Sequence, residues 1–195
     1  MILLVRPDGD FIDATIDSQR RAGLTYSQVG WTMRSQCPDG FATNQWNAVI
    51  GKGELVFERA KAALQNYQLL QLGWIQHVGP SDPIAANSIV CTLGRQFMVY
   101  SLNFAKIVYV DDRISTQFSF GYGTTCEHPL IGEERFTVSI DASTGDVTYS
   151  IFSFSRPNAF VFQLALPWLR RAQRRFCRDS TEAMHAACRH EHATR

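Results

Sequence analysis

The sequence predicts an α+β fold in which an antiparallel sheet wraps around a long C-terminal helix, the helix-grip arrangement. Short runs rich in Ile, Val, Phe and Tyr alternate with clusters of turn residues between positions 74 and 155. The connections between these runs are too short for crossover helices, so the strands are expected to pair antiparallel. An amphipathic stripe at helical spacing then occupies the C-terminal part of the chain.

Length and composition indicate one globular domain. The chain has 195 residues, of which 45% are hydrophobic and 19% charged, values that fit a packed core and exclude a disordered chain. We expect residues 1–195 to form a single domain. Within it, residues 1–25 are expected to form an N-terminal extension and residues 190–195 a tail, both loosely ordered.

The central elements follow from periodicity and turn signals. A helix is expected after Gly51-Lys52-Gly53, because apolar residues then recur at helical spacing until Gly73, which ends the pattern. Seven strands are expected after it. They cover residues 74–78, 88–93, 97–104, 106–111, 117–124, 134–141 and 147–155. The turn at 142–146 makes the last two strands a hairpin.

The last helix is expected to lie across the sheet. Its apolar stripe consists of Leu169, Ala172, Phe176, Ser180, Ala183 and Ala187. Pro167 would remove the backbone bond to Gln163, so any helix arriving from Pro157 is expected to kink or break there. Phe176, central in the stripe, is expected to pack against the sheet.

Several functional classes have no support in the sequence. The net charge of +1 does not attract nucleic acid or anionic membranes, so neither is an expected partner. The opening residues lack the features of a signal peptide, and the longest later apolar segment, 160–169, is too short to span a bilayer. The five cysteines are scattered without a C-x-x-C pair, as is usual in a reducing compartment. We therefore expect a soluble cytoplasmic protein with no metal and no cofactor.

A set of motifs resembles one protein family over residues 26–183. Within this range, the dipeptide Gly73-Trp74 fits the pattern of the family and lies N-terminal to its main motifs. The motifs that carry the resemblance are Gly121-Tyr122-Gly123-Thr124, His128-Pro129, Gly132-Glu133-Glu134-Arg135-Phe136 and Ser155-Arg156-Pro157. Together they are similar to domain-of-unknown-function family 1990, also called uncharacterised protein family 0548. The resemblance implies a START or Bet v 1-like fold, whose members mostly enclose a hydrophobic ligand cavity between sheet and helix. It implies no catalytic residue, and a fold does not fix a function.

Strand alternation selects Glu134 as a candidate site residue. In the strand over 134–141, Glu134 shares a face with Phe136, Val138 and Ile140, so it should point into the core. A carboxylate there needs a partner or a raised pKa. Candidate partners are Tyr122, His128 and Arg156, with Phe120 as a pocket-lining residue on the strand of Tyr122. The alternative is a structural role for Glu134 at the sheet margin, capping backbone groups or pairing with an arginine.

Three functional hypotheses remain open. The first is a binding module that holds a small, partly apolar ligand between the sheet and the last helix. The second is an enzyme in which Glu134 and His128 form an acid–base pair while Tyr122 or Arg156 orients the substrate. The third is an interaction scaffold that uses the basic face of the last helix, formed by Arg170, Arg171, Arg174, Arg175 and Arg178. The sequence leaves the oligomeric state open.

Overall fold

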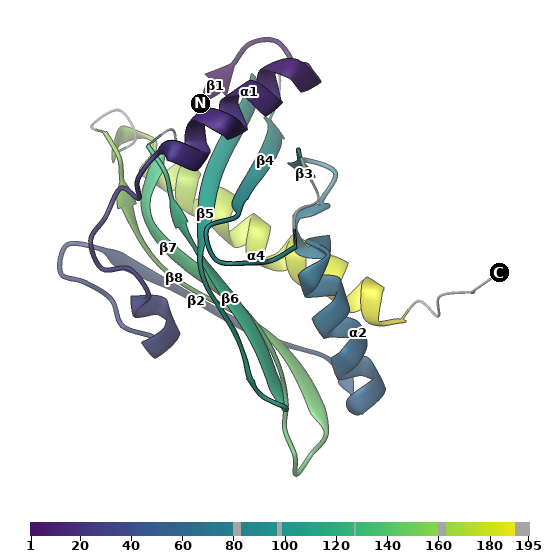
Figure 1. Cartoon of the computed structure of the whole chain (residues 1–195). Helices are drawn as coiled ribbons and strands as arrows, with labels where there is room; N and C mark the ends of the chain where they lie inside the picture. The colour runs from purple at the N-terminus through teal and green to yellow at the C-terminus, as the bar shows by residue number, and fades with distance from the viewer. Residues whose placement is uncertain (80–82, 97–98, 127, 160–162, 190–195) are drawn as a thin grey trace.

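The protein is a curved antiparallel sheet wrapped around its last helix (Figure 1). The computed structural model describes residues 1–79, 83–96, 99–126, 128–159 and 163–189. Its sheet has eight strands, of which seven follow the order β2-β8-β7-β6-β5-β4-β3 while β1 pairs with β5. The described elements are β1 (Ile2–Leu3), α1 (Gly9–Arg21), η1 (Trp31–Arg34), β2 (Ala42–Lys52), α2 (Glu54–Gln65), η2 (Gln68–Leu70), β3 (Ile75–Val78), β4 (Ile89–Gln96), β5 (Val99–Ile114), β6 (Gln117–Thr124), β7 (Leu130–Ile140), β8 (Asp146–Pro157) and α4 (Leu166–Arg189).

The predicted architecture, an α+β fold in which an antiparallel sheet wraps around a long C-terminal helix, is confirmed. The strands from β3 to β8 form a meander in which each pairs antiparallel with the next. β2 lies between α1 and α2 in sequence but pairs with β8, so the first long strand lies beside the last one. α4 then crosses the inner face of this sheet (Figure 1).

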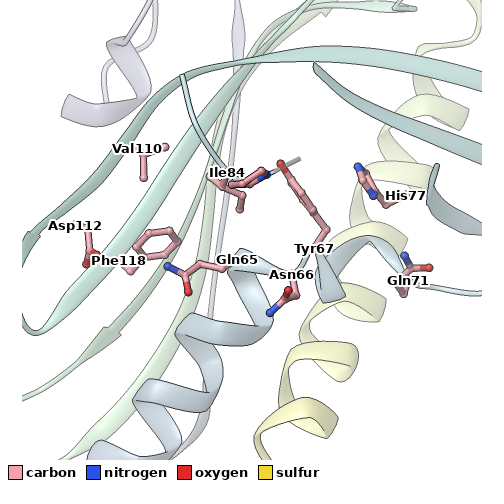
Figure 2. Close-up of a pocket in the computed structure, with 10 residues that line it drawn as sticks. Gln65, Asn66, Tyr67, Gln71, His77, Ile84, Val110, Asp112 and Phe118 are labelled. Atoms are coloured by element: carbon pink, nitrogen blue, oxygen red, sulfur yellow. The ribbon is translucent and has the colours of Figure 1, made fainter. Parts of the chain in front are cut away.

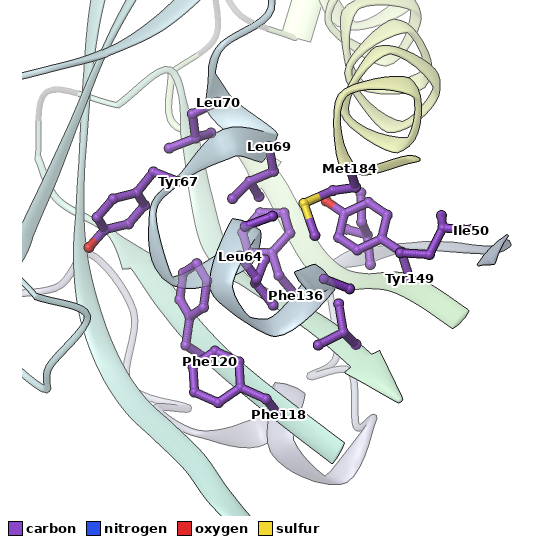
Figure 3. Close-up of a cluster of buried hydrophobic side chains, with 14 of the residues drawn as sticks. Ile50, Leu64, Tyr67, Leu69, Leu70, Phe118, Phe120, Phe136, Tyr149 and Met184 are labelled. Carbon is purple, nitrogen blue, oxygen red and sulfur yellow. The ribbon is translucent and has the colours of Figure 1, made fainter. Parts of the chain in front are cut away.

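The main core lies between the inner face of the sheet and the segments α2, η2 and α4. Alternation along the strands directs one set of side chains to this face, including the fully buried Phe120, Phe136 and Tyr149. Leu64 from α2 and Met184 from α4 meet them there, both at 0% exposure (Figure 3). Burial of this apolar surface is the main force that fixes α4 on the sheet.

The outer face of the sheet carries α1, which differs from the loosely ordered extension expected over residues 1–25. Asp8 caps this helix by accepting a hydrogen bond from the backbone N–H of Phe11 at 2.9 Å. Ile12 and Ile16, one turn apart, are buried in a second apolar cluster with Leu102 and other residues of β4 and β5. The apolar surface of the outer face orders this segment. Residues 190–195 lie outside the described residues.

Several predicted elements differ from the structure. β2 was not among the predicted strands. From residue 99 onward, the predicted strands 97–104 and 106–111 form one strand, β5, while residues 97–98 lie outside the described residues. The pairing of β5 with β6 is irregular between Ile107 and Tyr109 and again beyond Asp111. The helix after Gly53 ends at Gln65, because Tyr67 has a φ of 54° in the left-handed region and begins the separate turn η2.

α4 begins at Leu166, which places Pro167 in the first turn, where its missing N–H costs little. The buried residues of α4 are Leu169, Cys177, Ser180, Met184 and Cys188. The stripe is therefore rotated slightly from the predicted one. Phe176 lies at its margin, half-buried, with its ring edge-on to Phe136 at a centroid distance of 6.1 Å.

Candidate functional site: a polar row on the inner face

A row of polar side chains crosses the inner face of the sheet in register. Tyr122 on β6 is the pairing partner of Glu134 on β7, which is paired with Ser153 on β8. Ser153 is paired in turn with Asn44 on β2. All four positions belong to the strand face that also carries the inner core. The predicted inward orientation of Glu134 is thereby confirmed.

Glu134 and Tyr122 form the central pair of this row. The Tyr122 hydroxyl donates a hydrogen bond to Oε2 of Glu134 at 3.0 Å. Burial raises the pKa of the Glu134 carboxyl to about 7, and the bond from Tyr122 only partly offsets this effect. Oε1 accepts no hydrogen bond from any described residue, and Glu134 keeps part of its surface accessible to solvent. The carboxyl group therefore has an acceptor that no described protein donor uses.

The rest of the row lies beneath α4. Ser153 is 3% exposed, and among the described residues its Oγ has no hydrogen-bond partner. The side-chain amide of Asn44 donates to Sγ of Cys177 at 3.4 Å, which connects the row to α4. Trp46 reinforces the connection, since its Nε1 donates to Oγ1 of Thr181 at 2.9 Å. Two side-chain hydrogen bonds thus join α4 to β2 beside this row.

His128 does not join this row. The backbone N–H of Leu130 donates to Nδ1 of His128 at 3.1 Å, and the Asn158 side chain donates to the His128 carbonyl at 2.9 Å. Burial lowers the pKa of the imidazole to about 4, so His128 is neutral at pH 7. Within the described parts of the chain, no hydrogen bond or ion pair links it to Glu134. The hypothesis of a Glu134–His128 acid–base pair thus lacks its required contact.

Two further predicted site residues lie elsewhere. Arg156 was expected beside Glu134, but alternation along β8 directs Ser153 and Ser155 inward and Arg156 outward. Its guanidinium lies 4.8 Å from the centroid of the Phe41 ring on the outer face. Phe120 is on the expected face but is 0% exposed, so it is a core residue and offers no surface to a ligand.

A hollow of about 550 Å³ opens at another part of the inner face, near the end of α2 (Figure 2). Its walls include Gln65, Tyr67, His77 and Phe118. Tyr67 stacks on His77 at a centroid distance of 4.5 Å. Glu134 does not line this hollow. The buried ring of Phe120 is in edge contact with Tyr67 at a centroid distance of 6.2 Å. On β6, Phe120 lies between this hollow and Tyr122.

Comparison with known proteins identifies the family. Residues 25–183 match the family model described as "Domain of unknown function (DUF1990)". The chain belongs to this family. A UPF0548 protein of Arabidopsis thaliana is 32% identical over 75% of this chain and 73% of its own length. A UPF0548 protein of Deinococcus radiodurans is 31% identical over 91% of this chain and 94% of its own.

Solved structures support the fold of this DUF1990 chain. A hypothetical protein from Helicobacter pylori aligns with a TM-score of 0.56 at 12% identity, over 86% of this chain and all of the other. A protein from Thermus thermophilus aligns with a TM-score of 0.51 at 9% identity, over 75% of this chain and 97% of the other. At these identities the likeness concerns the fold alone.

Glu133, which was not among the predicted site residues, is buried on the outer face of the DUF1990 chain at 2% exposure. Its Oε2 accepts hydrogen bonds from the Tyr26 hydroxyl and the Gly30 N–H, both at 2.7 Å. Its Oε1 accepts from the N–H of Thr32 at 2.9 Å and from the Thr32 hydroxyl. Gly30, with a φ of 82°, allows the backbone donors to converge. Glu133 therefore anchors the segment from Tyr26 to Thr32. Because Glu133 directly precedes the inward-facing Glu134 in β7, alternation along the strand predicts that Glu133 points outward.

The basic face of α4 is partly engaged within the DUF1990 chain itself. Asp179 forms ion pairs with Arg175 at 3.2 Å and Arg178 at 3.0 Å. Arg175 also lies 4.3 Å from the Trp74 ring centroid. No described helix is long and apolar enough to cross a membrane. Within the described ranges, no three His, Cys, Asp or Glu side chains are grouped to hold a metal ion.

Proposed function

We propose that this protein binds a small, partly apolar ligand between the sheet and α4, with the polar group of the ligand held by Glu134 and Tyr122. The observation that carries the proposal is the free acceptor Oε1 on a deeply set carboxyl group that keeps accessible surface. Leaving such a group without a partner is costly, and perturbed carboxyl groups are concentrated at functional sites. A ligand that donates a hydrogen bond to Oε1 would relieve this cost.

The neighbouring side chains define the ligand chemistry. Oε2 of Glu134 already accepts a hydrogen bond from Tyr122. The ligand group that binds Oε1 must therefore be a hydrogen-bond donor such as a hydroxyl or an amine. The buried hydroxyl of Ser153 has an unused hydrogen-bonding capacity beside it. Phe176 contributes a half-buried aromatic surface from α4. This combination suits an apolar body that carries one polar head, the usual character of small-molecule sites.

Catalysis has less support than binding. An acid–base mechanism needs titratable groups that converge on the reacting atom. The pKa of Glu134, about 7, would suit proton transfer, but His128 forms its hydrogen bonds within its own loop. Binding requires only the contacts that Glu134, Tyr122 and Ser153 offer.

The experiment uses the neutral fluorescent probe N-phenyl-1-naphthylamine, which combines apolar rings with one N–H donor. We expect its fluorescence to rise on binding to the protein, and decylamine to displace it at concentrations at least ten-fold lower than decanoate. Glu134→Gln should reduce this preference for the amine. Asp112→Asn is the matched control, because Asp112 lines the hollow near α2 and is remote from the polar row.

A filling variant tests the location. Ser153→Leu adds carbon atoms beside Glu134, so it should weaken probe binding at least five-fold if ligand space lies there. If the site is already filled by protein atoms, the variant should instead lose about 1–3 kcal/mol of stability through overpacking. Absence of probe binding to the wild-type protein, or equal binding to Ser153→Leu, would contradict the proposal.

A further inference from the structure

A second recess, of about 470 Å³, lies on the outer face of the sheet. Arg156 from the end of β8 and Phe41 from the segment before β2 line it, together with Tyr26, Ser27 and Gln28. It lies on the opposite face of the sheet from Glu134, so it is independent of the function proposed above. Its volume falls within the range of small-molecule sites.

The aromatic walls of this recess are fixed before any ligand arrives. Phe41 and Tyr26 both pack edge-on against the buried Phe154, at centroid distances of 5.3 and 5.7 Å. The Tyr26 hydroxyl is also held by Glu133 at 2.7 Å. Rings that are already immobilised lose little conformational entropy when a flat molecule packs against them.

Arg156 supplies an unneutralised cation at this wall. Its guanidinium lies over the Phe41 ring at 4.8 Å, which orients the group. The ion pairs among the described residues join carboxylates to other lysine and arginine side chains. Arg156 takes part in none of these pairs. The planar fork of a guanidinium matches the two oxygens of a carboxylate or a phosphate.

The negative charge of Asp39 favours a carboxylate over a phosphate as the bound anion. Asp39 lines the same recess without forming an ion pair with Arg156, so its negative charge opposes any bound anion. The repulsion grows with the charge of the ligand, and it penalises a phosphate dianion more than a monocarboxylate. Ser27 and Gln28 add polar side chains at the rim that can contact a carboxylate.

We infer that this recess is a second binding site, for a small aromatic monocarboxylate whose carboxylate pairs with Arg156 and whose ring packs between Tyr26 and Phe41. The charge and the flat shape are both required. Neutral analogues lose the pair with Arg156, and inorganic phosphate loses the ring contacts and is repelled by Asp39.

Titration of the full chain with benzoate, benzamide and inorganic phosphate tests the site, with calorimetry for affinity and NMR to locate the perturbed signals. We expect benzoate to shift the signals of Tyr26 and Gln28 and to bind at least ten-fold more tightly than benzamide or phosphate. Arg156→Gln should weaken benzoate binding at least ten-fold, Arg156→Lys by less, and Asp39→Asn should strengthen it. Arg95→Gln is the matched control, because Arg95 is another exposed arginine placed over an aromatic ring, that of Tyr100 at 5.9 Å.

Three results would overturn the assignment. Equal affinity for benzamide would remove the role of charge, and equal affinity of Arg156→Gln would remove the role of this arginine. Tighter binding of phosphate than of benzoate would exclude a monocarboxylate site. Melting temperatures of the variants, measured alongside, distinguish loss of the site from loss of the fold.

Discussion

Replacement of Glu134 by glutamine should change the stability of the protein in a pH-dependent way. Burial raises the pKa of this carboxyl from the ordinary value of 4.5 to about 7. The unfolded chain therefore releases the proton near pH 4.5, whereas the folded protein keeps it until about pH 7. A group with a raised folded-state pKa contributes stability that is fully present below pH 4.5 and is lost as the pH rises through about 7.

The size of the effect follows from the separation of the two pKa values. At roughly 1.4 kcal/mol per pKa unit, the shift from 4.5 to about 7 corresponds to about 3 kcal/mol. Glu134 retains some contact with water, which weakens the penalty, so we expect about 1–3 kcal/mol. Glutamine is close in shape to the protonated side chain. Glu134→Gln should therefore match the wild type at pH 4 and exceed its stability by this amount at pH 8.

Urea unfolding followed by tryptophan fluorescence at pH 4, 5, 6, 7 and 8 measures this difference. A companion variant, Tyr122→Phe, removes the hydrogen bond that favours the ionised carboxylate. In that variant the carboxyl titration, followed by NMR, should move to higher pH. If Glu134→Gln is less stable than the wild type by the same amount at every pH, Glu134 is a structural hydrogen-bonding group and the reasoning fails.

Three other substitutions test the framework. Glu133→Gln should destabilise by about 3 kcal/mol in urea unfolding, because its NH₂ group would face the N–H and hydroxyl donors that now surround the carboxylate; a change under 1 kcal/mol would contradict the anchor. Gly132→Ala should cost about 3 kcal/mol, since its Cβ would lie 2.0 Å from the Phe154 carbonyl oxygen; unchanged stability would refute that close approach. Ile16→Ala should cost about 3 kcal/mol and lower the amide-exchange protection of α1; wild-type protection would show that Ile16 does not hold α1.

Much of the inner architecture could be predicted from the sequence. Alternation is a local property of a strand, so it places Glu134 with Phe136 and Val138 without knowledge of the partner strands. The same rule, applied to β8, would have placed Arg156 outward, opposite in direction to Ser153 and Ser155. Arg156, one of the three candidate partners of Glu134, therefore does not reach it, because its guanidinium lies over the Phe41 ring on the other face.

Other features depend on contacts between distant segments. α1 is ordered because Ile12 and Ile16 meet apolar side chains of β4 and β5 on the outer face, and its own sequence is too polar to show this. The environment of Glu133 depends on Gly30 and Thr32, which lie about a hundred residues earlier. Neither contact has a local signal.

The sequence by itself determined the strand periods, the turns, the long last helix and the side of the sheet to which Glu134 points. Each follows from geometry over a few consecutive residues. Only the tertiary structure decided which side chains meet across the sheet. The register of β6 with β7 brings Tyr122 to Glu134, and the packing of α4 leaves Oε1 without a donor among the described residues. Burial, hydrogen bonding and the pKa of about 7 arise from that long-range packing, because they depend on groups brought together from distant parts of the chain.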